Sequence, residues 1–185
     1  MLRIKKWSKS FLFITLISLF VNSISAISVF SNDTMKYTPL VNKISAGGSF
    51  SLALDKNGEI IAWGRNNLLQ CYAPSGIFTD ISAGLTHSLA LKTDGSVEAW
   101  GTKETSGIPS EFKSEIKAIS AGGHSLALKT DGSVVSWDDI YEIPSEAKSD
   151  VIAISAGISH SLALKNDGSV ISMGKKYIQR VHCSS

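Results

Sequence analysis

The sequence predicts an all-β protein, a β-propeller built from four short three-stranded repeats. One segment recurs four times, and its copies lie at residues 43–64, 80–101, 118–138 and 153–174. Alanines at the same point of successive copies are 37, 38 and 35 residues apart: Ala46, Ala83, Ala121 and Ala156. A repeat array buries its core by stacking units, so this periodicity defines an architecture and names no chemistry.

Each copy carries the pattern of a β-hairpin. Two leucines alternate with Ser and Ala, as in Leu89 and Leu91, and a period of two indicates a strand. A dipeptide suited to a tight two-residue turn follows in every copy: Asn57-Gly58, Asp94-Gly95, Asp131-Gly132 and Asp167-Gly168. A second strand is therefore expected at 59–63, 96–100, 133–137 and 169–173, antiparallel to the leucine strand.

A third strand is expected before each hairpin, most clearly at 151–155, with an Ala-Gly turn leading into the leucine strand. Large side chains on one face and small ones on the other indicate that neighbouring units cover both faces, as propeller blades do. A solenoid is the competing stack, but antiparallel meanders of this length fit radial blades better.

The first residues have the layout of a secretory signal peptide. Four basic residues precede an apolar run over 11–21, and small residues follow, so cleavage near Ala26 is expected, with Ser28 or Ser31 as alternatives. An uncleaved anchor is the competitor, although a spanning helix needs roughly 20 apolar residues. The predicted organisation is signal peptide and short linker (1–31), linker (32–39), propeller region (40–174) and irregular tail (175–185).

Removal of residues 1–31 leaves fourteen basic against sixteen acidic residues, scattered without a single-sign patch. Nucleic-acid binding is therefore disfavoured, and no membrane contact is expected after cleavage. Two cysteines are too few for a disulfide framework. A Cys71–Cys183 bridge would require the first and last repeats to be neighbours, and two free thiols are the alternative.

The connectors 65–79, 102–117 and 139–150 vary between copies, and we expect them to lie on one rim as a binding surface for a protein partner. Their aromatic residues are candidates for that surface, with loop anchoring as the alternative: Tyr72, Phe78, Phe112 and Tyr141. The periodic tryptophans fit blade packing first and partner binding second: Trp63, Trp100 and Trp137.

No catalytic residue, metal site or cofactor is predicted. His87, His124 and His160 occupy the same repeat position, which favours a structural turn element over a metal ring. The turn aspartates are likewise better explained by hairpins than by calcium. The glycine pairs lack a following Lys-Ser or Lys-Thr, so no phosphate loop is indicated.

The string AG-x-x-HSLALK-x-DGSV-x-x-WG, best seen at 83–101, resembles the repeats of the regulator of chromosome condensation family. The short period is similar to that of compact bacterial members, among them secreted β-lactamase inhibitor propellers. The resemblance implies a protein-binding scaffold and about seven blades for a closed ring. This chain departs from the pattern in having Phe50 for His, Met173 for Trp, one residue fewer before His124, and only four units.

Three functions follow as hypotheses. The first is a secreted or cell-surface, non-enzymatic module that binds a protein through one rim, and inhibition of a secreted enzyme is its sharpest form. The second is nucleotide exchange on a small GTPase, which rests on the resemblance to the eukaryotic founder alone. The third is a truncated fragment without function. With four units, the ring is either incomplete or completed by self-association of the chain.

Overall fold

The computed structural model describes residues 40–102, 108, 114–136 and 142–174, and these form twelve β-strands and one short 3-10 helix, η4 (Ser145–Lys148). The first six strands are β1 (Val41–Ala46), β2 (Phe50–Asp55), β3 (Ile60–Gly64), β4 (Phe78–Ala83), β5 (His87–Lys92) and β6 (Val97–Gly101). The last six are β7 (Ile116–Ala121), β8 (Ser125–Lys129), β9 (Val134–Ser136), β10 (Val151–Ala156), β11 (His160–Lys165) and β12 (Val170–Gly174).

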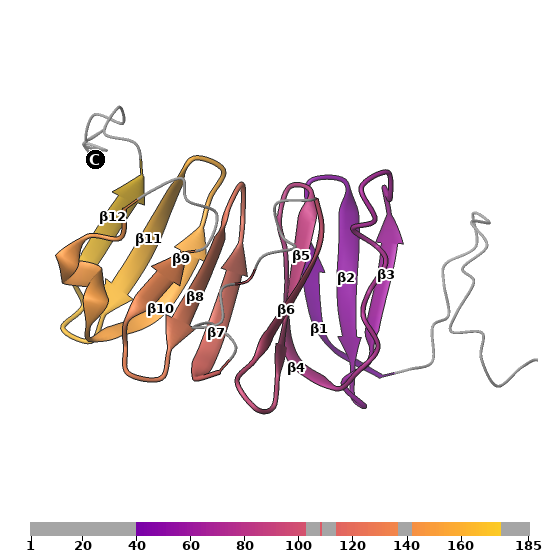
Figure 1. Ribbon diagram of the computed structural model, residues 1–185, viewed down its shortest axis with the longest axis horizontal. Coiled ribbons are helices and arrows are strands. Elements are labelled where there is room, and N and C mark those ends of the chain that lie inside the picture. Colours follow the sequence, from indigo (N-terminus) through magenta and orange to yellow (C-terminus); the bar gives the residue numbers. More distant parts are fainter. Residues whose placement is uncertain (1–39, 103–107, 109–113, 137–141, 175–185) are drawn as a thin grey trace, which may run out of the picture. The chain divides into compact units, whose positions relative to one another are not determined.

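The strands form four separate three-stranded antiparallel sheets, each built from three consecutive strands (Figure 1). We call these blades 1 to 4 in chain order. The middle strand of each is the leucine strand, as predicted. The register shifts by one residue near the start of every first strand, as between Val41 and Lys43 and between Phe78 and Asp80. The antiparallel meanders exclude the solenoid and confirm an all-β propeller of four blades.

The predicted hairpin turns are present in all four blades. Their glycines adopt positive φ angles that side-chain-bearing residues rarely adopt, between +78° at Gly95 and +86° at Gly132. Asp94 supports its turn by accepting hydrogen bonds from the Ser96 backbone N–H (2.9 Å) and hydroxyl (2.6 Å). Blade 1 has Asn57 at this position, and the nearby Asp55 carboxylate accepts the turn N–H groups instead.

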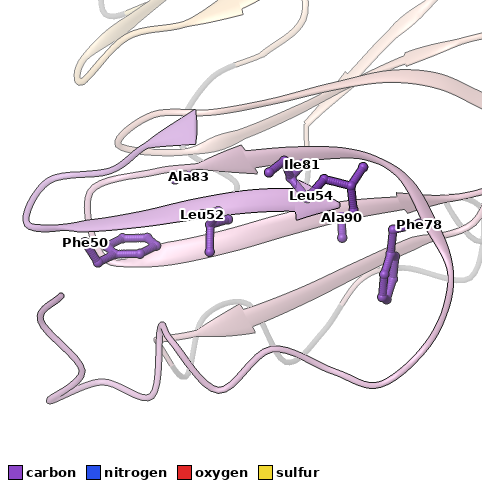
Figure 2. Close-up of a cluster of buried hydrophobic side chains, with 7 residues drawn as sticks. All are labelled: Phe50, Leu52, Leu54, Phe78, Ile81, Ala83 and Ala90. Carbon is purple, nitrogen blue, oxygen red and sulfur yellow. The ribbon is translucent and has the colours of Figure 1, made fainter. Parts of the chain in front are cut away.

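The core lies between blades. Leu52 and Leu54 of β2 are fully buried, and they pack against Ile81 and Ala90 of the next blade, as Figure 2 shows. The same contact recurs between blades 2 and 3 and between blades 3 and 4. Large leucines therefore meet small or branched residues of the following blade, which is the large-against-small packing expected from the sequence.

The four described blades do not close a ring. The outward face of blade 1 exposes Ile44, and that of blade 4 exposes Leu162 and Val170, whereas the corresponding residues at the internal joints are buried or half-buried. Within the described residues no helix is long and apolar enough to cross a membrane. The predicted signal segment, the linker and the tail at 175–185 lie outside the described part of the chain.

Two expectations about the connectors need correction. Phe78 was expected in the first connector, but it is the first residue of β4 and it is buried in the core. The connector also does not lie on one rim: the Arg65 N–H donates to Ser49 O at the Ala-Gly-turn end, whereas the Phe78 N–H donates to Gly58 O at the hairpin end. The chain must cross from one rim to the other because the third strand of a blade ends opposite the start of the next.

Candidate functional site

Backbone hydrogen bonds join the Ala-Gly turns of successive blades. The Gly48 N–H donates to Gly84 O (3.0 Å), Leu85 to Gly122 (2.9 Å) and Gly123 to Gly157 (2.9 Å). The turns approach so closely that a Cβ on Gly122, the glycine that follows Ala in all four turns, would lie 2.2 Å from Gly157 O. Glycine at this position therefore permits the blades to meet.

A serine on each first strand adds a second bond to every joint. Ser45 Oγ accepts the Ala83 N–H at 2.9 Å, and the same bond runs from Ala121 to Ser82 and from Ala156 to Ser120. The equivalent serine of blade 4, Ser155, is exposed.

The repeated histidines also link blades. His87 Nε2 lies 2.9 Å from Ser125 Oγ of the next blade, and His124 Nε2 is hydrogen-bonded to Ser161 Oγ in the same way. Both histidines are buried, whereas His160 of blade 4 is exposed. Within the described ranges, no group of three or more His, Cys, Asp or Glu side chains is placed to hold a metal ion. The histidines are structural elements of the joints.

Blade 1 replaces the histidine with Phe50, and a different group supplies the missing partner. The Gln70 main-chain carbonyl accepts hydrogen bonds from Ser88 Oγ (3.0 Å) and from Trp100 Nε1 (2.8 Å). Gln70 is itself buried. The connector between blades 1 and 2 is thereby fixed to blade 2.

Two shallow depressions occur on the described surface. One, of about 260 Å³, lies among the Ala-Gly turns and is lined by small residues with Leu85 and Ile158. The other, of about 390 Å³, lies at the hairpin end between blades 2 and 3, beside Lys92, Asp94 and Glu115. The first depression has no titratable side chain in its lining; at the second, Lys92 is paired with Glu98 at 2.6 Å and the Thr79 hydroxyl donates to Leu91 O. Neither presents a catalytic arrangement.

The connector 65–77 is the strongest candidate for a binding surface. Short hydrogen bonds fix its shape: Asn66 Oδ1 accepts the Cys71 N–H (2.9 Å), and the Tyr72 N–H donates to Leu69 O (2.9 Å). Leu69 has a φ of +63°, which is uncommon for a residue other than glycine. Strain of this kind persists only where the surroundings impose it.

This connector exposes three large apolar side chains, which we call the connector surface: Leu69 (60% exposed), Tyr72 (74%) and Ile77 (66%). An exposed aromatic on a fixed loop is a typical anchor in protein interfaces. Sequence reasoning named Tyr72 but missed Leu69 and Ile77. Their apolar character in a non-repeating segment was the signal that could have found them.

The other predicted rim residues divide into three groups. Trp63 is half-buried, and Trp100 packs against the blade 1–blade 2 core while its indole N–H is bonded to Gln70, which favours the blade-packing interpretation for Trp100. Phe78 is only 3% exposed and cannot contact a partner, so it anchors the chain instead. Phe112, Trp137 and Tyr141 lie outside the described residues.

Two sets of groups have perturbed acidity. The hydroxyl and backbone N–H of the serine two residues further on hold the pKa of three turn carboxyls below its ordinary value: Asp94, Asp131 and Asp167. Burial raises the pKa of the Cys71 thiol, which is free. Cys183, its predicted bridging partner, lies outside the described part of the chain.

This arrangement defines a β-propeller repeat protein with a fixed connector and two open end faces. The model of the Regulator of chromosome condensation (RCC1) repeat matches residues 41–70, 78–107 and 151–175. Three stretches of the chain, in blades 1, 2 and 4, therefore carry repeats of this family. No curated protein matches it.

Solved propellers share the fold. The CRINKLY WD40 ectodomain of the receptor kinase ACR4 from Arabidopsis thaliana is 22% identical, with a TM-score of 0.60 over 73% of this chain and 51% of that one. Prp20p from Saccharomyces cerevisiae, described with its binding to Gsp1p and histones, is 19% identical, with a TM-score of 0.58 over 75% and 46%. The chain thus spans about half the length of these relatives.

Proposed function

We propose that this protein is an exported, non-enzymatic module that binds another protein through the connector surface. The observation that carries the proposal is the combination of a hydrogen-bonded connector with three largely exposed apolar side chains. A contiguous exposed apolar patch is a mark of an interaction site, and aromatic residues are enriched at the cores of protein interfaces.

The similar propellers support a binding role in general terms. Prp20p is described by its binding to Gsp1p and histones, and the yeast protein has also been solved bound to Kap60. Likeness at this identity shows the fold alone, so the partner class here is argued from location. The predicted N-terminal export signal would place the encounter with the partner outside the cytoplasm, and a secreted enzyme held in an inhibited state fits the proposal.

Export is tested by fractionating cells that express the full chain with a C-terminal tag. A shortened chain in the medium or on the cell surface is expected, and a full-length chain in the cytoplasm would overturn this part of the proposal. The alternative function, nucleotide exchange on a small cytoplasmic GTPase, requires that cytoplasmic location. No feature of the described residues favours that alternative.

Partner binding is tested by using the purified chain as bait on the proteins of the same medium. The Tyr72→Ala and Leu69→Ala variants should lose the captured protein, because truncating an interface anchor typically costs more than 1 kcal/mol. Ile152→Ala, which changes an exposed apolar residue on β10 instead, is the matched control and should retain it. Equal capture by all variants would show that the connector surface is not the site.

Self-association that completes the ring belongs to the same proposal, and the two end faces determine its form.

A further inference from the structure

The two end faces of the stack are the two halves of a joint that already occurs three times within the chain. Each internal joint brings the leucine face of one blade against the first strand of the next. Blade 4 presents a leucine face and blade 1 presents a first strand, and both are open. The apolar residues at these ends show what is missing.

On the blade 1 side, Ile44 is 80% exposed, whereas its counterparts Ile81 and Ile119 are 7% and 9% exposed and Ile154 is half-buried. On the blade 4 side, Val170 is 61% exposed, against 7% for Val97 and 3% for Val134. Leu162 is 39% exposed, and the equivalent leucines of the other blades are at most 1% exposed. The leucine face of blade 4 and the first strand of blade 1 therefore each lack the apolar contact that the equivalent surfaces make at an internal joint.

The polar groups at the ends are complementary as well. At every internal joint the hairpin glycine carbonyl accepts the N–H that begins the next blade, as Gly132 accepts from Val151 at 3.0 Å. The same series would pair Gly168 O with the Val41 N–H. It would also pair Ser155 Oγ with the Ala46 N–H, and the Ile158 N–H with Gly47 O.

The histidine bond also has an open member at each end. His124 bonds to Ser161 across the last internal joint, and His160 is the next histidine in the series. The serine at the matching position of blade 1 is Ser51, which is half-buried. His160 and Ser51 are the pair that a further joint would bring together.

We infer that two copies of this chain associate head to tail, blade 4 of each on blade 1 of the other, and close one ring of eight blades. The occupant is a second copy because, among the surfaces of the described residues, the blade 1 face matches the blade 4 face in its hydrogen-bond donors and acceptors and in its apolar residues. A ring of two copies has eight blades, which lies within the four to eight that propellers use. The inference rests on the propeller-module part of the proposed function and not on export or on the external partner.

The test is the molar mass of the full chain by light scattering after size exclusion, over a range of concentrations. We expect twice the mass of one chain, and a monomer throughout or a mass that keeps growing with concentration would overturn the ring. Capture of an external partner is not needed, so failure here and failure of the connector surface are distinguishable.

Two end-face variants give the interface its direction. Ile44→Asp spoils only the blade 1 face and Val170→Asp only the blade 4 face, so either variant alone should be monomeric. An equimolar mixture should regain a dimer, because one intact joint remains between an Ile44→Asp copy and a Val170→Asp copy. If two identical faces paired instead, one variant alone would stay dimeric and mixing would not increase the amount of dimer. That result would overturn the head-to-tail arrangement. Recovery in the mixture also shows that both variants are folded.

Removal of the His160 ring should weaken the dimer as well. His160→Ala or Ser51→Ala should raise the dimer dissociation constant by roughly tenfold or more, since both joints lose a hydrogen bond. Ser159→Ala, beside His160 on the same exposed turn, is the control and should leave it unchanged. Equal behaviour of all three variants would contradict the assigned pair.

Discussion

His87 of blade 2 and Ser125 of blade 3 form a buried hydrogen bond across the joint, with Nε2 2.9 Å from Oγ. The bond recurs between blades 3 and 4 but is absent between blades 1 and 2, where Phe50 stands in the histidine position and Gln70 supplies a carbonyl instead. The joints are thus equivalent in packing but differ in their polar contacts, and these differences can be measured.

Ser125→Ala should lower the free energy of unfolding by about 1–3 kcal/mol, because it removes a buried partner of the His87 ring. The midpoint of urea unfolding, with an unchanged slope, measures this loss. Ser49→Ala, at an exposed serine of blade 1, is the control and should fall within about 0.5 kcal/mol of the unaltered chain. Equal stability of the two variants would mean that the histidine bond does not hold the joint.

Trp100→Phe should loosen the connector 65–77. The substitution keeps an aromatic ring but removes the indole N–H that donates to Gln70 O at 2.8 Å. Proteolytic cleavage within the connector should accelerate, since local opening sets that rate. Trp63→Phe is the matched control, because no hydrogen bond ties Trp63 to the connector among the described residues, and cleavage that accelerates equally in both variants would contradict the role given to Gln70.

Gly58→Ala should be more destabilising than Gly168→Ala. Both glycines have nearly the same φ, +83° and +85°, so the cost of a left-handed alanine, about 1–2 kcal/mol, is common to both. At Gly58 the added Cβ would lie 2.7 Å from Ile77 Cγ2 of the connector and 2.9 Å from Phe78 O of the next blade, whereas nothing lies within 4 Å at Gly168. Urea unfolding of both in the Ile44→Asp background, which removes association, measures the difference, and equal losses would show that the joint yields without cost.

The turn aspartates should make stability fall in acid. Their folded-state pKa is lowered by the serine hydroxyl and N–H groups, so the stabilisation is complete above the ordinary value of 3.8 and is lost as pH falls through the lower, folded-state pKa. Substitution of all three by asparagine, the residue that blade 1 carries as Asn57, should weaken the pH dependence of stability. The midpoint of urea unfolding should then fall less as the pH is lowered from neutral to below 3.8. An unchanged acid profile in the triple variant would assign the loss to other carboxyls.

The repeating part of this fold could be predicted from the sequence because each local signal occurs four times. Alternating leucines predict the strands, and Asn-Gly or Asp-Gly dipeptides predict the turns. A signal that is weak in one copy can be read from the other three. The same alignment could have placed Phe78 correctly. It corresponds to Val41, Ile116 and Val151, which begin the first strand of the other blades, so it could have been predicted as the first residue of a strand.

The connector could not be predicted in the same way, because it occurs once and its shape depends on contacts made at a distance. The Gln70 carbonyl meets Ser88 and Trp100, which follow it by 18 and 30 residues, and Leu69 adopts a backbone angle that its residue type does not favour. Hydrogen bonds between a main-chain carbonyl and remote side chains leave no periodic trace in the sequence.

Blades 2 and 3 each have two joints, whereas blades 1 and 4 of a single chain have one. In a linear array the energy of each unit is the sum of its own stability and its neighbour terms, so amide protons of the two outer sheets should exchange with solvent before those of the inner sheets. Closure into a ring would give every blade two neighbours and remove this difference between outer and inner sheets. Amide exchange would therefore distinguish an open stack of four blades from a closed ring.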